Sequence, residues 1–339
     1  MKRTTMVALA LALGLAACTA PTPAPGPTPT VLRDLAAQTG IAIGTAINVD
    51  LLDNPTYADL AATQFNSVTA ENAMKWEQIE PTQGMYNWAP ADRLVEFAAA
   101  HGQTVRGHTL IWHSQTPAWL PEAATHLTDA EFADLVKRHV SDEVAHFAGK
   151  IWQWDVVNEA FDDGGGLRDT IFRQRLGDDY IAQVFQWAHA ADPTALLFYN
   201  DYGLEYGGSK AKAVLTMVTD LKARGIPIDG VGFQAHYETT APVPSGLAGV
   251  MAQFTALGLV VAVTEMDVRG SNPTYVASYY TTTLNACRGV HACISFTVWG
   301  ISDKDSWIPQ AFPGLTPYCL YDATYRPHPW YADLAAALG

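Results

Sequence analysis

Eight short apolar runs alternate with helical or irregular stretches, and this alternation predicts an α/β fold, a single (β/α)8 TIM barrel. Most runs are continuously apolar, as in parallel strands that are buried on both faces. The length of 339 residues and the hydrophobic content of 49% suit one such domain, which we place at residues 31–339. Its active-site cleft is expected at the carboxyl ends of the strands. The predicted strands lie near residues 41–49, 65–69, 103–109, 151–157, 196–200, 230–235, 259–264 and 293–299.

Helix signals occupy the gaps between these runs. Residues 128–147 carry an apolar stripe and begin with Thr128 three residues before Glu131, which is the spacing of a capping box. Residues 208–224 form a second predicted helix, which Gly225 ends, with Pro227 soon after it. No internal repeat is visible, so the barrel is expected to be one unit.

The N-terminus has the features of an export signal. Lys2 and Arg3 precede an apolar stretch too short to cross a bilayer, so residues 1–17 are predicted to be a signal peptide. The segment Leu15 to Cys18 resembles a bacterial lipobox, in which Cys18 is lipidated and becomes the first mature residue. Ordinary secretion, with Cys18 removed, is the alternative. Residues 18–30 are rich in Pro and Thr and are expected to be a linker between the anchor and the domain.

The net charge indicates which ligands are disfavoured, and the cysteines predict one disulfide and one free thiol. The net charge of −14 would repel nucleic acid phosphates and anionic lipids, so a neutral substrate is favoured and the predicted anchor is the only membrane contact expected. In an oxidising compartment Cys287 and Cys293, which bracket a short loop, are predicted to form a disulfide. Cys319 stands in an apolar context and is expected to be a buried free thiol.

Two glutamates end comparable apolar runs. Glu159 follows the fourth predicted strand, and Glu265 follows the seventh. Cleavage of a glycosidic bond requires at least a pair of carboxyl groups, and two separate strand ends can supply such a pair. Other polar and aromatic residues collect at the same predicted rim. A single strand-end Glu, His or Asn is more often a structural residue, but a whole ring of them at the catalytic face favours a site.

Six segments together resemble glycoside hydrolase family 10 endo-β-1,4-xylanases, and the similarity extends from about residue 32 to the C-terminus. The segments are residues 69–76 (TAENAMKW), 106–113 (RGHTLIWH), 154–160 (WDVVNEA), 232–236 (GFQAH), 264–267 (TEMD) and 298–303 (VWGISD). This resemblance implies a retaining endo-xylanase that hydrolyses internal β-1,4-xylosidic bonds of xylan by double displacement.

The resemblance assigns the catalytic roles. Glu159 would be the acid and then the base, and Glu265 the nucleophile that forms a covalent glycosyl-enzyme, with the two carboxyl groups about 5 to 5.5 Å apart. His236 would orient Glu265, and Asp267 would fix the tautomer of the imidazole. Asn158 would contact the sugar 2-hydroxyl.

The remaining predicted site residues would bind sugars, mostly on the non-reducing side of the cleaved bond, and Gln234 faces the cleft with a less defined role. They are Glu71, Asn72, Lys75, His108, Trp112, Gln234, Trp299 and Trp307. The Trp rings would stack on sugar faces. The resemblance implies neither a cofactor nor a catalytic metal, and the histidines lack the helical His-Glu-x-x-His spacing of zinc hydrolases. The expected partners are xylan and xylo-oligosaccharides, bound by a monomer.

Two other functions are compatible with parts of this pattern. A β-1,4-glucanase or cellobiosidase-like hydrolase would use the same carboxylates, because a site that only lacks room for a hydroxymethyl group discriminates modestly. A lipoprotein that binds polysaccharide without cutting it would have no use for two closely placed carboxylates, which cost desolvation energy.

Overall fold

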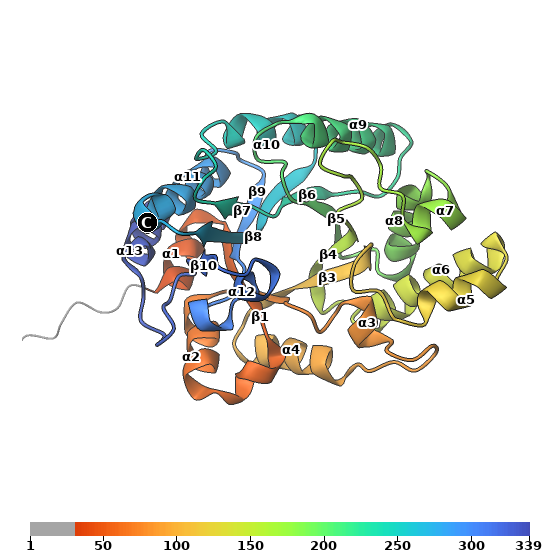
Figure 1. Ribbon diagram of the computed structural model, residues 1–339, viewed down its shortest axis with the longest axis horizontal. Helices are drawn as coiled ribbons and strands as arrows, with labels where there is room; N and C mark the ends of the chain where they lie inside the picture. Colours follow the sequence, from red (N-terminus) through yellow and green to blue (C-terminus); the bar gives the residue numbers. More distant parts are fainter. Residues whose placement is uncertain (1–30) are drawn as a thin grey trace, which may run out of the picture. The chain divides into compact units, whose positions relative to one another are not determined.

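The computed structural model describes residues 31–339, in which eight parallel strands close into a barrel (Figure 1). The predicted signal peptide, Cys18 and the linker lie outside the described residues. Each of the eight predicted apolar runs overlaps one barrel strand, so the predicted fold class is confirmed. The barrel strands, in their order around the barrel, are β1 (Ala42–Ile47), β2 (Ser67–Ala70), β3 (Thr104–Trp112), β4 (Ile151–Asn158), β5 (Leu196–Asp201), β6 (Gly230–Phe233), β8 (Val260–Gly270) and β9 (Cys293–Val298).

Strands β3 and β8 are longer than predicted. β8 continues to Gly270, so Glu265 and Asp267 lie within this strand rather than after its end. Beyond the barrel, β8 pairs with two short strands, β7 (His236–Glu238) and β10 (Thr316–Pro317). The register of β7 places His236 opposite Asp267. The extra length of β8 therefore brings a histidine and two carboxylates together at the rim.

Helices surround the strands, and α4, α9, α10 and α11 lie outside the barrel in Figure 1. The capping box is present: the Thr128 hydroxyl accepts from the Glu131 N–H, and the Glu131 carboxylate accepts from the Thr128 N–H. The helices are α1 (Leu32–Thr39), α2 (Pro55–Gln64), α3 (Trp76–Ile79), α4 (Ala89–Ala100), α5 (Leu120–His126), α6 (Asp129–His146), α7 (Ile171–Leu176), α8 (Tyr180–Ala191), α9 (Ser209–Ala223), α10 (Leu247–Thr255), α11 (Val276–Arg288), α12 (Ile308–Ala311) and α13 (Pro329–Leu338).

The interior of the barrel contains charged and polar groups. Arg106 on β3 donates to the Thr264 carbonyl on β8 over 2.8 Å, although β3 and β8 are not neighbouring strands. Its side chain therefore crosses the barrel, where Asp155 and Gln153 are also fully buried. A buried charge is costly unless it is paired, and Arg106 and Asp155 pair with each other in the barrel interior.

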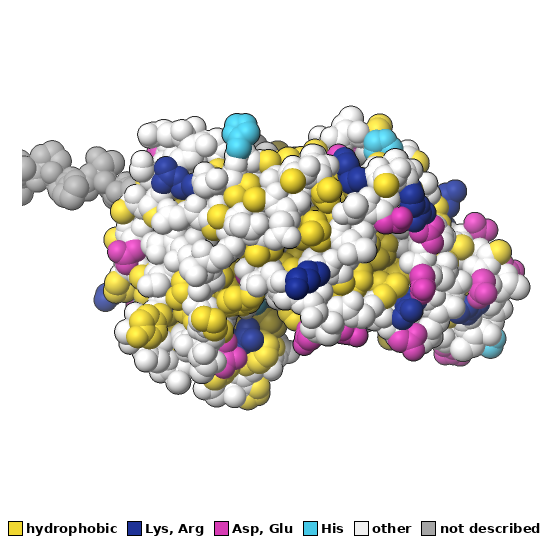
Figure 2. Space-filling model, turned by 90° about the horizontal axis from the view of Figure 1, so that it is seen from above, with side chains coloured by type: hydrophobic (Ala, Val, Ile, Leu, Met, Phe, Trp, Pro, Cys, Tyr) yellow, Lys and Arg dark blue, Asp and Glu magenta, His cyan; other side chains and the backbone are white. Residues whose placement is uncertain are grey.

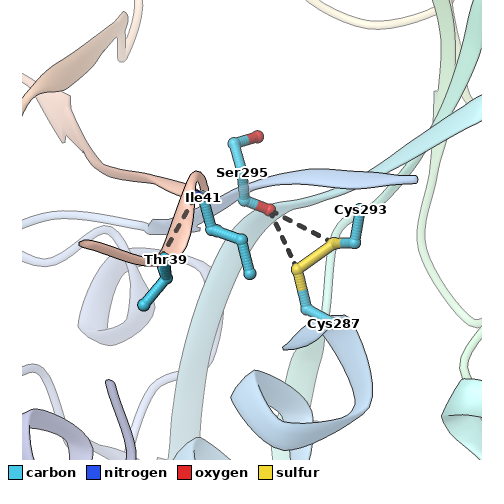
Figure 3. Close-up of a disulfide and its surroundings, with 5 residues drawn as sticks. All are labelled: Thr39, Ile41, Cys287, Cys293 and Ser295. Atoms are coloured by element: carbon cyan, nitrogen blue, oxygen red, sulfur yellow. Dashed lines mark hydrogen bonds between the residues drawn. A yellow bond between two sulfur atoms is a disulfide. The ribbon is translucent and has the colours of Figure 1, made fainter. Parts of the chain in front are cut away.

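A disulfide joins the end of α11 to the start of β9 (Figure 3). Cys287 and Cys293 have Cα atoms 5.3 Å apart, and both sulfur atoms face the carbonyl oxygen of Ser295. The predicted pairing is thus present in the structure. Cys319 is a buried free thiol, as predicted.

Acidic and basic side chains are interspersed on the face shown in Figure 2. Among residues 31–339, no helix combines the length and apolar character that a membrane span requires.

Candidate active site

Glu159 directly follows β4 and has a left-handed backbone conformation, with φ at 55°. Such a conformation is unfavourable for a residue with a Cβ and persists when its surroundings hold it. Three contacts do so here. The Glu159 N–H donates to the Asn200 carbonyl (2.9 Å), and the Glu159 carbonyl accepts from Arg168 Nε (3.0 Å). The next N–H, of Ala160, donates to the Tyr199 hydroxyl (2.9 Å).

Three donors surround the Glu159 carboxylate. Trp112 Nε1 donates to Oε2 over 3.0 Å, and Gln234 Nε2 donates to Oε1 over 2.9 Å. Asn158 Nδ2 also lies 3.2 Å from Oε1. These donors come from β3, β4 and the residue that follows β6, so three separate elements orient the side chain.

Glu265 lies deeper in the barrel and is 4% exposed. Its Oε1 accepts from Asn200 Nδ2 (2.7 Å) and lies 3.5 Å from Arg106 Nη2, while its Oε2 faces His236 Nε2 at 3.1 Å. Burial alone would raise the pKa of Glu265. The charges of His108 and Arg106 and the hydrogen bond from His236 outweigh burial and lower this pKa to about 2. Glu265 is therefore ionised, as a nucleophile must be.

Asn200 connects the two glutamates. Its Nδ2 donates to Glu265 and also to Asn158 Oδ1 (2.9 Å), and Asn158 in turn donates to Glu159. The Thr264 hydroxyl donates to Asn200 Oδ1 (2.7 Å), which fixes the direction of the amide. A Cβ on Gly232 would lie 2.2 Å from Asn200 Oδ1, so a glycine is needed beside this amide. The two carboxylates thus share one network of buried amides.

His236 lies between two carboxylates. Its Nδ1 is 2.7 Å from Asp267 Oδ1, and its Nε2 faces Glu265. Burial lowers the pKa of His236, but the charge of Asp267 and the hydrogen bonds to Asp267 and Glu265 raise it to about 10. Both ring nitrogens therefore carry protons. Asp267 is hydrogen-bonded to the His236 ring and orients it toward Glu265, as the sequence predicts.

Ligand-type atoms of His108, Asp155 and Glu265 lie within 4.8 Å of one another. The Arg106 guanidinium occupies this cluster, donating to Asp155 and lying close to Glu265. His108 Nδ1 also lies 2.8 Å from Asp155. Because a fixed cation already compensates these carboxylates, the residues present do not fit a metal site.

A second group of predicted residues lines the side of the site formed by β2 and β3. Lys75 Nζ donates to Asn72 Oδ1 (3.0 Å) and to Gln115 Oε1 (2.7 Å), and lies 5.0 Å from the Trp112 ring centre. Burial lowers the pKa of Lys75 despite the opposing charge of Glu265 and Glu71. Burial also raises the pKa of the Glu71 carboxyl. Exposed Asn72 and partly exposed Trp112 leave polar and aromatic surface for a ligand.

Trp299 and Trp307 lie on the side of His236. Trp299 follows β9, is 6% exposed, and meets the His108 ring edge-on at 5.3 Å between ring centres. Trp307 is partly exposed, donates its Nε1–H to Asp267 Oδ2 (2.7 Å), and lies 5.1 Å from the His236 ring centre. The structure therefore brings all the predicted catalytic and sugar-binding residues to the same end of the barrel.

The model of glycosyl hydrolase family 10 matches residues 31–337. The chain belongs to this family.

Relatives in the family resemble the chain over most of its length. Endo-1,4-beta-xylanase A of Phanerodontia chrysosporium is 36% identical over 317 residues, covering 91% of this chain and 77% of the relative. Endo-1,4-beta-xylanase 1 of Gibberella zeae is 39% identical over 304 residues, covering 86% of this chain and 85% of the relative.

Solved family 10 structures have the same fold. Native xylanase 10B from Thermotoga maritima has a TM-score of 0.87 at 36% identity, covering 91% of this chain and 98% of that one. Xylanase 10B from Thermotoga petrophila in complex with xylobiose has a TM-score of 0.88 at 35% identity, covering 92% and 98%.

Four site residues were absent from the set predicted for this family 10 chain. Arg106, Asp155 and Asn200 are buried beneath or beside Glu265, and Gln115 supports Lys75. The sequence did indicate Arg106 and Asp155, because a charged residue inside an apolar barrel strand requires a buried partner. Gln115 has φ at 47° in the loop after β3, and its residue type carried no comparable signal.

Proposed function

We propose that this protein is a retaining endo-β-1,4-xylanase that cleaves internal β-1,4-xylosidic bonds. The observation that carries the proposal is the amide network that joins an ionised, buried Glu265 to a partly exposed Glu159. Two carboxylates with different surroundings at one site are the requirement for glycoside hydrolysis with a covalent intermediate. Membership of family 10 and the xylanase relatives support the same reaction.

In the first step, a Glu265 oxygen attacks the anomeric carbon, and the bond between that carbon and the leaving sugar oxygen breaks. Glu159 donates its proton to that oxygen, so the leaving sugar departs as an alcohol. The product is an ester between Glu265 and the sugar. The imidazolium of His236 and the Asn200 amide hold Glu265 during the attack.

In the second step, Glu159 accepts a proton from water, and the water oxygen attacks the anomeric carbon of the ester. The bond to Glu265 breaks, which restores both carboxylates to their starting states. Two displacements at one carbon retain its configuration. Asn158 lies between the glutamates, where its amide can meet the sugar 2-hydroxyl.

Xylan is the substrate class that we assign to the cleft. The solved relative from Thermotoga petrophila holds xylobiose, and the same fold surrounds the cleft of this chain. Trp299 and Trp307 border the catalytic histidine and would crowd a hydroxymethyl group at sugar C5. Exclusion by crowding is worth about 1 to 3 kcal/mol, so slow cleavage of glucose-based aryl substrates is expected.

Initial rates on xylan and on carboxymethyl cellulose test this assignment. We expect faster release of reducing ends from xylan, with oligosaccharides of several lengths as early products. Faster cleavage of the cellulose derivative would favour a β-1,4-glucanase instead. The Glu159→Gln and Glu265→Gln variants provide the control, because reducing sugar released at the wild-type rate by either variant would contradict the catalytic assignment.

We also propose that the protein is exported and held at the bacterial cell envelope by a lipid on Cys18. The apolar leader, the Leu-Ala-Ala-Cys sequence at residues 15–18 and the Pro/Thr-rich linker support this proposal. Mass spectrometry of the native N-terminus tests it. A lipidated N-terminal cysteine is expected, whereas a mature chain that begins after Cys18 would indicate ordinary secretion.

A further inference from the structure

Glu205 is a buried carboxylate that the catalytic steps above do not use. It lies on the segment between β5 and α9 and is 2% exposed. Its Oε1 accepts a hydrogen bond from the Ala235 N–H over 2.7 Å. Burial of a carboxylate is costly unless it accepts a hydrogen bond, and here the donor is a backbone N–H in the connection between β6 and β7.

Ala235 is the residue that this bond holds. It is one of four non-glycine residues in the described chain with a positive φ, at 60°, and it is fully buried. Glu159 is another of the four. Left-handed backbone at a residue with a Cβ is rarely populated and depends on surrounding contacts. The Glu205 bond supplies such a contact at the Ala235 peptide.

The two neighbours of Ala235 each contact one catalytic carboxylate. Gln234 donates to Glu159 Oε1 over 2.9 Å, and His236 Nε2 faces Glu265 Oε2 at 3.1 Å. The Ala235 backbone therefore sets the relative direction of the side chains that orient the acid and the nucleophile. A shift of this peptide would move both contacts together.

We propose that Glu205 is a positioning residue that fixes both catalytic carboxylates through the Ala235 peptide. This inference rests on the proposed double-displacement reaction. The proposed role requires that a side-chain oxygen of residue 205 reaches the Ala235 N–H. The length of the side chain therefore matters more than its charge.

Substitutions that separate reach from charge test the proposal. Glu205→Gln keeps the length of the side chain and a carbonyl acceptor but loses the charge. Glu205→Asp keeps the charge but shortens the reach by one methylene. The matched controls are Glu143→Gln and Glu143→Asp, because Glu143 on α6 is also fully buried and lies away from the catalytic residues.

The rate of nucleophilic attack is measured with 2,4-dinitrophenyl 2-deoxy-2-fluoro-β-xylobioside, whose leaving group needs no proton. The reagent should inactivate the wild-type enzyme by labelling Glu265. We expect Glu205→Asp to be inactivated roughly tenfold more slowly or worse, because small misplacements of reacting groups have large kinetic effects. Glu205→Gln should stay within about threefold of wild type, and both Glu143 variants should match wild type in this assay. Chemical denaturation verifies that each variant is folded at the assay temperature.

Hydrolysis of a xylobioside with a poor leaving group reports on Glu159 in the same variants, and Glu205→Asp should be slowed there also. Wild-type inactivation rates for folded Glu205→Asp, or equal slowing of the Asp and Gln variants, would overturn the inference. If Glu205→Asp does not fold, Glu205→Gln decides alone: a tenfold loss would overturn the proposal, and a near wild-type rate would support it. Failure of the reagent to label wild-type Glu265 would instead contradict the proposed function.

Discussion

Arg106 and Asp155 form an ion pair inside the barrel, with side chains 1% and 0% exposed. The same guanidinium lies 3.5 Å from Glu265 and donates to the Thr264 carbonyl (2.8 Å). One cation therefore compensates two buried carboxylates and ties β3 to the strand that carries the nucleophile. The Arg106 guanidinium occupies a part of the barrel interior that apolar side chains could fill. We therefore infer that its role is to position Glu265.

Replacing Arg106 with methionine should strongly destabilise the protein. The variant removes the guanidinium that pairs with buried Asp155 and lies beside Glu265, and removal of one partner of a buried pair costs about 3 to 5 kcal/mol. Urea denaturation of both proteins measures the difference in the free energy of unfolding. Arg93→Met is the control, because Arg93 pairs with Asp53 at the surface and its loss should cost less than about 1 kcal/mol. Equal effects of the two substitutions would contradict the assigned role of Arg106.

The raised pKa of His236 predicts a loss of stability in alkali. Because the folded pKa is about 10 and the ordinary value is 6.5, the contribution of the imidazolium is complete below pH 6.5 and disappears as pH rises toward 10. The free energy of unfolding should therefore differ between wild type and His236→Asn more at pH 6 than at pH 10. A difference that is constant over this range would show that the ring is not held as an imidazolium.

Trp112→Phe should weaken the acid step while leaving an aromatic ring, a phenyl group, at this position. The substitution removes the Nε1–H that donates to Glu159 Oε2. This hydrogen bond strengthens as Glu159 loses its proton and becomes charged, and hydrogen bonds to charged groups are worth about 1.5 to 3 kcal/mol. A decrease in kcat of about tenfold or more is expected, larger for substrates with poor leaving groups. Trp187→Phe on α8 is the control, since Trp187 lies outside the site. A loss that is independent of the leaving group would point to disturbed sugar binding instead.

Removal of the disulfide should change stability without changing catalysis. Cys287 and Cys293 are six residues apart, and a closed loop of this size predicts a loss of about 2 kcal/mol in the Cys287→Ser, Cys293→Ser double variant. Cys293 begins β9, whereas the site lies beyond the other end of that strand. Thermal denaturation and xylan hydrolysis at 25 °C measure the two effects. A large fall in kcat at that temperature would contradict the separation of the disulfide from the site.

Much of this molecule could be predicted from the sequence because barrel strands are buried on both faces. Their apolar runs are visible without a structure, and the strand ends point to Glu159, Glu265 and His236. The boundaries were less accurate at β8, because residues 267–270 pair with β7 and β10 outside the barrel. No local sequence pattern predicts this pairing.

The sequence marks charged residues inside the barrel strands, but it does not identify their partners. Arg106 reaches Asp155 from a neighbouring strand and Thr264 from across the barrel, and such partners depend on register and closure. Glu159 and Ala235 have left-handed backbone conformations, but neither residue is a glycine, so the sequence does not indicate these conformations. The residues that hold these two positions, Tyr199 and Glu205, become visible only when the backbone donors have coordinates.

The configuration of the first product tests the catalytic account most directly. Proton NMR during hydrolysis of xylohexaose, recorded before mutarotation equilibrates the anomers, identifies the reducing-end configuration at the newly cleaved bond. Attack by Glu265 followed by attack of water predicts that the β-anomer appears first. Initial release of the α-anomer would show single displacement by water and would contradict the assignment of Glu265 as the nucleophile.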